Sequence, residues 1–202
     1  MGRFLDTLRE RVVIFDGATG TNLQQRELGA DDFGGPALEG CNEILAVTRP
    51  AVIAELHRSF FDVGVDAVET DTFGAFPVVL AEYGIAERTF ELNEAAARIA
   101  KEVASGYSTP DRPRWVVGSI GPGTKLPSLG QIDFVALRDG YEAQVAGLLA
   151  GGVERLAAGA EDPSGEDRHG EDVGSDLGRR GGRQGGGDRH VGGSFAGGTG
   201  GH

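Results

Sequence analysis

Short runs of consecutive apolar residues alternate along the chain with polar, glycine-rich clusters and with longer segments of helical periodicity. The apolar runs cover residues 12–15, 65–68 and 115–117. Apart from Asp66, every residue in these runs is apolar, and the absence of a regular alternation with polar residues is typical of strands buried on both faces. The runs therefore predict three buried parallel strands.

Amphipathic patterns with helical spacing lie between and after these runs. They extend from Pro50 to Gly64, from about residue 87 to 104, and from about residue 134 to 150. Pro50 suits a helical first turn and Gly64 a helix end. The third pattern is expected to turn six side chains inward: Val135, Leu137, Tyr141, Val145, Leu148 and Leu149. Strand, polar turn and helix in repetition are typical of an α/β protein with a parallel sheet.

A small or polar cluster follows each predicted strand. The clusters are residues 16–21, 69–74 and 118–124. In α/β barrels and doubly wound sheets, ligands bind at the carboxyl ends of the strands. The clusters are therefore the candidate site, although glycine and aspartate also make ordinary tight turns.

The pattern breaks after Val153, where a fourth strand is expected. Residues 154–202 hold 16 of the 35 glycines and follow neither the strand nor the helix period. Their large apolar residues are only Leu156, Val173, Leu177, Val191 and Phe195. Burial of so few side chains does not offset the entropy of ordering the backbone. We therefore predict a folded part at residues 1–153 and a disordered, low-complexity tail at residues 154–202.

Composition narrows the class of protein further. The 202 residues include 31 acidic and 19 basic side chains, a formal net charge of −12, which excludes a nucleic-acid module with a basic face. The single cysteine, Cys41, excludes an intramolecular disulfide and a cysteine-only zinc site. The first residues lack the apolar region of a secretory signal, and no segment is long enough to span a membrane. We expect a cytoplasmic protein with no membrane partner.

The three clusters offer different chemistry. Residues 16–21 place glycines where backbone N–H groups can approach a carboxylate or phosphate, but they lack the P-loop lysine and the full dinucleotide fingerprint. Residues 69–73 bring two carboxylates and two hydroxyls to a strand end, where an ammonium group can be bound. Residues 121–123 form either a close-approach loop or a rigid turn. A small zwitterion suits this combination.

Two further residues with reactive side chains have simpler interpretations. His57 falls inside the first helical pattern and is expected to be a surface or partly buried helix residue. Cys41 is expected to be an incidental loop thiol. The sequence contains no visible nucleophile, base and orienting group, so a hydrolytic triad is unsupported.

Three segments resemble a known family in order and spacing. DGATGTNLQ, GCNEILAVTRPAVIAELHRSFFDVGVDAVETDTFGA and VGSIGPGTKLPSLGQIDF resemble the N-terminal homocysteine-binding domain of cobalamin-dependent methionine synthases, within the homocysteine S-methyltransferase family. The resemblance runs from about residue 11 to residue 153 and implies a partial (β/α)8 TIM barrel with about the first three β/α units. It implies methyl transfer from methylcobalamin or methyltetrahydrofolate to homocysteine, giving methionine. Folate- and cobalamin-binding domains are the partners in the full-length family.

The resemblance also implies which residues bind substrate. The matching residues of the first loop are Asp16, Gly17, Thr19 and Gly20. The E-T-N-T-F segment of the family, which helps to hold the amino acid, matches Glu69, Thr70, Asp71, Thr72 and Phe73. The loop after the third strand matches through Ser119, Gly121 and Pro122. Asp71 replaces the asparagine of the family, which adds a negative charge and makes the site less favourable for the homocysteine carboxylate.

The metal of the family has no ligands in this sequence. The resemblance implies zinc held by three cysteines from late barrel strands, which lowers the pKa of the substrate thiol. Cys41 precedes the second predicted strand and cannot replace them. We assign no catalytic and no metal-binding residue, and we expect the chain alone to be inactive. The alternatives are a non-catalytic fragment or amino-acid-binding module, and an α/β phosphate-binding protein.

A shift of reading frame would explain the change in composition. Codons for residues 165–168, read one base later, can encode Val-Lys-Thr-Ala, the kind of helix that the family carries there. We therefore hypothesise that the sequence from about residue 154 is translated out of frame. The gene sequence tests this, since a single-base shift should restore strand-like runs and the missing cysteines.

Overall fold

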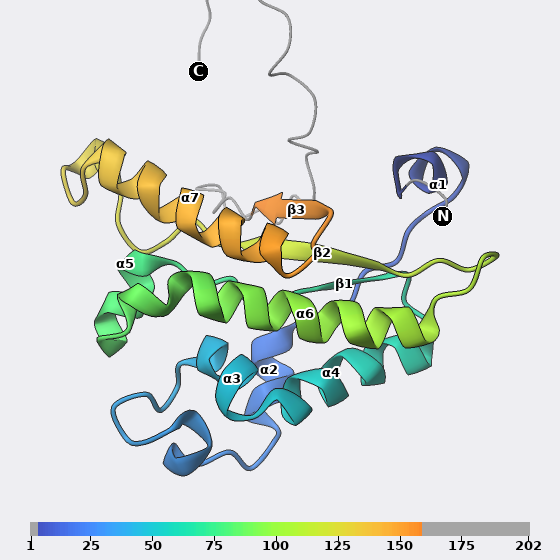
Figure 1. The fold of residues 1–202 in the computed structure, drawn as a ribbon, viewed down its shortest axis with the longest axis horizontal. Helices are drawn as coiled ribbons and strands as arrows, with labels where there is room; N and C mark the ends of the chain where they lie inside the picture. Colours follow the sequence, from blue (N-terminus) through green and yellow to red (C-terminus); the bar gives the residue numbers. More distant parts are fainter. Residues whose placement is uncertain (1–3, 159–202) are drawn as a thin grey trace, which may run out of the picture. The chain divides into compact units, whose positions relative to one another are not determined.

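The computed structural model describes residues 4–158 (Figure 1). The chain divides into two compact units, residues 1–172 and 173–202, and all described residues lie in the first. The α-helices are α1 (Phe4–Glu10), α2 (Thr19–Gln24), α3 (Leu45–Thr48), α4 (Pro50–Val63), α5 (Pro77–Leu80), α6 (Thr89–Tyr107) and α7 (Phe134–Ala150). Short 3-10 helices are η1 (Ala30–Phe33), η2 (Asn42–Ile44), η3 (Ala81–Tyr83), η4 (Ala86–Arg88) and η5 (Pro127–Leu129). Within this part of the chain, no helix combines the length and the apolar character needed to cross a membrane.

A parallel sheet positions the candidate site. Its strands are β1 (Ala67–Glu69), β2 (Trp115–Ile120) and β3 (Arg155–Ala158), in that order across the sheet. Ala67 lies opposite Trp115, and Val117 lies opposite Arg155. Helices connect successive parallel strands, as the alternation of patterns predicts. The α/β class is thereby confirmed.

The first predicted strand forms only in part. Phe15 makes a single parallel bridge to Ala67, and the Ile14 carbonyl accepts hydrogen bonds from the N–H groups of Asp66 and Ala67. The expected burial is wrong, because Val12 is 81% exposed and Ile14 is 58% exposed. A strand that is apolar on both faces is buried only where other elements cover both faces, and within residues 4–158 this segment joins the sheet through β1 alone.

A strand also forms where the sequence pattern was expected to end. β3 begins two residues after Val153 and pairs in parallel with β2 from Val117 to Ile120. The sequence pattern did not predict β3, because β3 reads Arg-Leu-Ala-Ala instead of a continuous run of large apolar residues. Only alternate side chains of β3 are half-buried. Strand pairing requires backbone N–H and C=O groups rather than large side chains. The rest of the predicted tail, from residue 159, lies outside the described residues.

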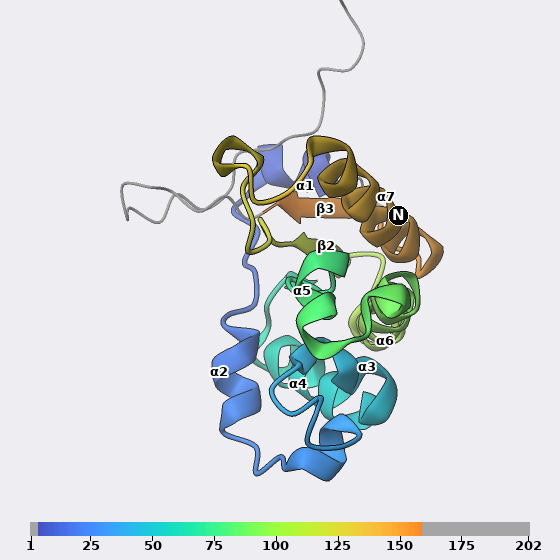
Figure 2. The same ribbon diagram turned by 90° about the vertical axis from the view of Figure 1, so that its left-hand side faces the viewer.

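The three long helices match their predictions closely. α4 has Pro50 in its first turn and ends at Gly64 with φ of 100°. α7 begins after Asp133, whose side chain accepts a hydrogen bond from the Val135 N–H at 2.7 Å. α6 runs past the predicted end, through Gly106 to Tyr107. Helices α4, α6 and α7 share one hydrophobic core with β1 and β2, and Figure 2 shows α6 and α7 on the same side of β2 and β3.

The inward face of α7 differs from its prediction. Val135 and Leu149 are exposed, whereas Gly140, Gln144 and Gly147 are buried. A Cβ on Gly147 would lie 2.6 Å from the Phe90 carbonyl oxygen of α6. The glycines therefore allow α7 to approach α6 closely, and this packing, rather than the largest side chains, sets the orientation of the helix.

Candidate functional site

The predicted site residues come together at the carboxyl edge of the sheet. Asp16 follows the bridge at Phe15, Glu69 ends β1, and Ser119 lies one residue before the end of β2. The Glu69 N–H donates to both carboxylate oxygens of Asp16 at 3.1 Å, and Ser119 Oγ donates to Glu69 Oε2 at 2.8 Å. One residue from each of three neighbouring strand positions thus joins a single polar network.

Asp16 and Glu69 form a pair of acceptors within this network. Burial is the main cause that raises the pKa of Asp16 to about 7, and the negative charge of Glu69 adds to it against the opposing hydrogen bond from the Glu69 N–H. A cation placed between the two carboxylates would offset both the loss of hydration and the repulsion between the negative charges. The arrangement is suited to an ammonium group.

The two threonines of the second cluster hold the loops together. The Ser119 N–H donates to Thr70 Oγ1 at 3.1 Å, and Thr72 Oγ1 donates to the Ser119 carbonyl at 2.7 Å. The hydroxyls of Thr70 and Thr72 lie 2.6 Å apart, and since Thr72 already uses its proton, Thr70 is the donor between them. Both side chains are buried. Their hydroxyls are therefore satisfied within the chain and fix the loop after β1 to the end of β2.

Asp71 is buried beside a carboxylate that the sequence analysis did not select. Its Oδ2 atom has no hydrogen-bond partner among the described residues. Burial raises the pKa of Asp71 to about 7, with a smaller contribution from the charge of Glu43. Glu43 Oε1 accepts from the Gly74 N–H at 2.9 Å, and Cys41 Sγ lies 3.7 Å from Glu43 Oε2. Glu43 lies in one of the segments that carry the family resemblance, which was the only available signal.

Gly121 needs to be glycine where the two loops meet. Its N–H donates to the Phe73 carbonyl at 3.1 Å, and a Cβ there would lie only 2.5 Å from the same oxygen. Phe73 is exposed and Pro122 is half-buried. An open hollow of about 340 Å³ adjoins this contact, and Tyr141 on its wall donates to the Gly121 carbonyl at 3.1 Å. Glycine at position 121 is therefore required by this contact within the chain, and whether the loop also approaches a ligand stays a prediction.

The remaining predicted residues lie in the loop after Asp16 and in α2. Thr19 and Gly20 begin α2, and Gly17 precedes it. A Cβ on Gly17 would lie 3.6 Å from Phe60, and one on Gly20 would lie 3.9 Å from Asn42, which are ordinary contacts. The packing of the chain therefore does not itself require glycine at these two positions.

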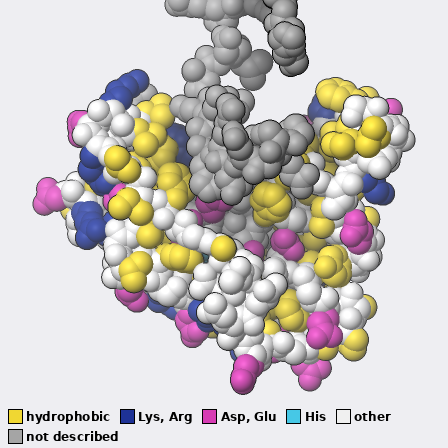
Figure 3. Space-filling view, turned by 180° about the vertical axis from the view of Figure 1, so that it is seen from behind, with side chains coloured by type: hydrophobic (Ala, Val, Ile, Leu, Met, Phe, Trp, Pro, Cys, Tyr) yellow, Lys and Arg dark blue, Asp and Glu magenta, His cyan; other side chains and the backbone are white. Residues whose placement is uncertain are grey.

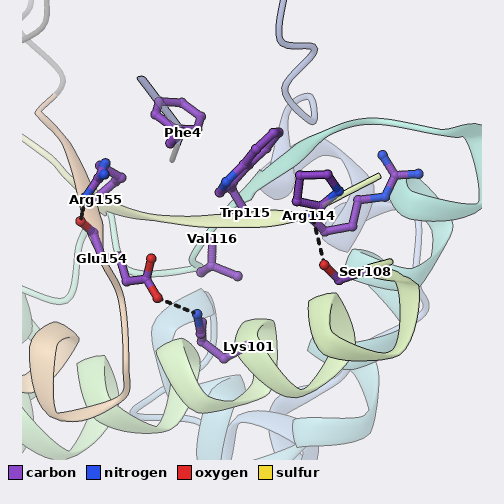
Figure 4. A pocket seen from close by; sticks show the side chains of 9 residues that line it. Phe4, Lys101, Ser108, Arg114, Trp115, Val116, Glu154 and Arg155 are labelled. Atoms are coloured by element: carbon purple, nitrogen blue, oxygen red, sulfur yellow. Dashed lines mark hydrogen bonds and ion pairs between the residues drawn. The ribbon is translucent and has the colours of Figure 1, made fainter. Parts of the chain in front are cut away.

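The opposite, amino edge of the sheet carries ion pairs that stabilise the fold. Asp66 receives two hydrogen bonds from Arg11 at 2.7 and 2.9 Å, and Arg114 lies 3.4 Å away. The Arg11 guanidinium holds the pKa of Asp66 below its usual value. A cavity of only about 50 Å³ lies nearby, and Figure 4 shows Phe4 and Trp115 among its lining residues. In parallel α/β folds the amino edge serves the fold and the carboxyl edge binds ligands.

Comparison with known proteins identifies the family. The profile of the family described as homocysteine S-methyltransferase matches residues 13–160. The chain belongs to this family. Two methionine synthases, from Mycobacterium tuberculosis and Mycobacterium leprae, are each 49% identical over 152 residues, which cover 75% of this chain. The chain spans only 13% and 12% of the length of these relatives.

Solved structures of the homocysteine methyltransferase MmuM from Escherichia coli share the fold. The metallated form matches with a TM-score of 0.60 and 21% identity, covering 76% of this chain and 55% of that chain. The oxidized form matches with the same TM-score and identity, covering 77% and 56%. The open sheet is therefore part of a TIM-like fold, as the sequence predicts.

The zinc site implied by the homocysteine S-methyltransferase family does not fit the described residues. Residues 4–158 contain no group of three histidine, cysteine or acidic side chains placed to hold a metal ion. Cys41 is buried, and burial with the charge of Glu43 raises the pKa of its thiol to about 12. A thiol held in its neutral form is a poor zinc ligand. Cys41 thus lies in a loop, as the sequence predicts, and is buried there.

Proposed function

We propose that the carboxyl edge of this chain binds homocysteine through its ammonium group. The observation that carries the proposal is that Asp16 accepts a hydrogen bond from the Glu69 N–H while the Glu69 carboxylate accepts one from Ser119 Oγ, which places both carboxylates in one network at the strand ends. Two carboxylates provide charge-assisted hydrogen bonds to an ammonium group. The remaining residues implied by the family resemblance are proposed to shape or support the same pocket: Gly17, Thr19, Gly20, Thr70, Asp71, Thr72, Phe73, Ser119, Gly121 and Pro122.

The electrostatics of this edge favour an amino acid over a phosphate. An anion placed there would face Asp16 and Glu69, with the buried carboxyl of Asp71 close by along the chain. Like charges disfavour binding of a phosphate. We therefore set the phosphate-binding alternative aside.

We further propose that the chain alone does not transfer a methyl group. A free thiol has a pKa of about 8.5, so homocysteine without zinc is mostly protonated near neutral pH. The described residues provide no metal site, and the chain spans 13% of the methionine synthase from Mycobacterium tuberculosis. The cobalamin- and folate-binding partners, and a cytoplasmic location, are part of this proposal.

Calorimetric titration of the purified chain with homocysteine tests the binding site. We expect Asp16→Asn and Glu69→Gln each to weaken binding roughly tenfold or more, because each removes one charge-assisted hydrogen bond. Glu39→Gln, at an exposed position in the loop before η2, is the matched control and should leave binding unchanged. Equal weakening by all three variants, or by none, would contradict the proposed site.

Metal analysis and a product assay test the proposal that the chain alone does not transfer a methyl group. We expect the purified 202-residue chain to hold no stoichiometric zinc and to produce no methionine from homocysteine and methylcobalamin. Stoichiometric zinc together with methionine formation would overturn the proposal of inactivity, whatever the titration shows.

A further inference from the structure

The described sheet is open at both edges, and both edges expose apolar side chains. At one edge Val12 is 81% exposed and Ile14 is 58% exposed. At the other edge Leu156 of β3 is 43% exposed, and within residues 4–158 β3 pairs only with β2. Figure 3 shows apolar side chains between acidic ones on one face of the molecule. Apolar side chains exposed at the edges of a parallel sheet are unusual, since both faces of such a sheet are normally covered and edge strands normally carry charges.

The number of strand positions is half of what a closed barrel needs. The segment at Phe15, β1, β2 and β3 provide four positions, all parallel. A TIM barrel has eight parallel strands. The coverage of 55% of the chain of metallated MmuM agrees with this proportion. Two copies of the described sheet therefore contain the strands of one barrel.

Among residues 4–158, the helix beside the open edge at β3 also has an apolar side that no other element covers. α7 packs against α6 through Gly147, while Val135 is 49% exposed and Leu149 is 58% exposed. On a helix of 3.6 residues per turn, position 149 lies almost half a turn away from position 147 and position 135 about a third of a turn away, so both face away from the contact with α6. In a complete barrel the next helix would cover this side. Among the described residues, the free edge of β3 and the exposed side of α7 are thus both places that the next β/α unit of a complete barrel would cover.

We propose that two copies of this chain associate edge to edge, with β3 of each copy beside residues 12–15 of the other. A partner that completes the sheet must offer a parallel strand at each of its two edges. A second copy, related by a two-fold axis along the barrel, offers both at once and leaves no free edge. The apolar side chains of Val12, Ile14 and Leu156 become buried in the two equivalent contacts.

Sedimentation equilibrium and native mass spectrometry of the 202-residue chain test the association. We expect a reversible dimer of twice the 21.0 kDa mass of one chain. Val12→Glu should weaken dimerisation roughly tenfold or more, because a charge on an edge strand opposes pairing. Val63→Glu is the matched control, since Val63 at the end of α4 is 80% exposed and distant in sequence from either edge, and it should dimerise like the parent. A circular dichroism spectrum shows whether each variant folds.

Cross-linking distinguishes the edge-to-edge arrangement from other dimers. We expect a short bismaleimide to join Val12→Cys to Leu156→Cys when the two variants are mixed, and to join neither variant to itself. Cys41 can remain, since it is buried and its thiol is held neutral. A monomer at every concentration, open-ended polymers, or cross-links within a single variant would each overturn the proposal. None of these outcomes depends on homocysteine binding.

Discussion

Burial shifts the pKa values of two side chains of this protein, Asp71 and His57, in opposite directions. Asp71 is buried with Oδ2 unpartnered, and His57 is buried with both ring nitrogens unpartnered among the described residues. A poorly hydrated site disfavours the charged form of either group. The pKa of Asp71 is therefore raised to about 7, and the pKa of His57 is lowered to about 4. His57 is also more deeply buried than the surface or partly buried position that the sequence predicts.

We expect Asp71→Asn to stabilise the protein at pH 8. The folded pKa of about 7 lies above the ordinary value of 3.8, so the stability that protonated Asp71 contributes is complete below pH 3.8 and is lost as the pH rises to 7. Asparagine stays neutral, and the variant should exceed the parent by roughly 2–4 kcal/mol at pH 8 and by little at pH 4. Urea unfolding at both pH values measures this. Asp31→Asn, at an exposed site, should show no such difference; a pH-independent gain for Asp71→Asn would contradict the argument.

We expect His57→Met to protect the protein against acid. The folded pKa of about 4 lies below the ordinary value of 6.5, so the unfolded chain binds the proton first and stability falls between pH 6.5 and pH 4. Methionine does not titrate and fills a similar volume. Thermal unfolding at pH 8 and pH 4.5 should show a gain at pH 4.5 that exceeds the gain at pH 8 by roughly 2 kcal/mol. Equal gains at both pH values would show that the histidine is not the titrating group.

Close contact between α6 and α7 depends on the absence of a side chain. Cβ atoms at Gly147 and Gly151 would lie 2.6 Å from the Phe90 carbonyl and 2.4 Å from Ala97 Cβ. Neither neighbour is a flexible side-chain end, so one helix would have to move. The two helices share the core that covers β2. A shift there would be transmitted to the strand that carries Ser119.

We expect Gly147→Ala to destabilise the fold by roughly 1–3 kcal/mol, although alanine is the better helix former. The backbone contact with Phe90 outweighs the gain in helix propensity. Ala146→Ser, at the exposed neighbouring position, should change the free energy of unfolding by less than roughly 0.5 kcal/mol. Urea unfolding compares the two variants, and a neutral Gly147→Ala would mean that the helices separate without cost.

The helices were more predictable than the strands, because their signals are local. Pro50 and Gly64 mark the two ends of α4 in the sequence, and Asp133 marks the beginning of α7. A strand depends on its neighbours instead. Residues 12–15 look like a buried strand, yet in the part of the chain that the structure describes they pair only with β1. In contrast, β3 pairs with the backbone of β2 without a run of large apolar residues.

Topology predicted part of the candidate site. The rule that parallel strands end at one edge correctly brought Glu69, Ser119 and Gly121 together. Glu43 was missed because it lies in η2, far in sequence from any predicted strand end. The direction in which Val135 faces was also wrong, since helix periodicity gives a face but not the neighbour against which it packs.

Two shortened chains separate the predicted end of the folded part from the end of β3. We expect a chain of residues 1–158 to unfold with the same cooperativity as the 202-residue chain. A chain of residues 1–153 should be less stable, because it loses the pairing of β3 with β2. Thermal unfolding measures both. Equal stability of the two shortened chains would show that β3 contributes nothing, and a loss of folding in both would contradict the predicted boundary between a folded part and a tail.

Trp115, which lines the small cavity at the amino edge, is a fluorescent probe of this part of the fold. Trp115 is the only tryptophan, it is buried, and its ring lies edge-on to Phe4 with 5.3 Å between centroids. The indole emission therefore reports whether α1 is packed against the start of β2. Removing residues 1–10 should shift the emission to longer wavelength as water reaches the ring, whereas saturating homocysteine at the far end of the strands should leave the spectrum unaltered.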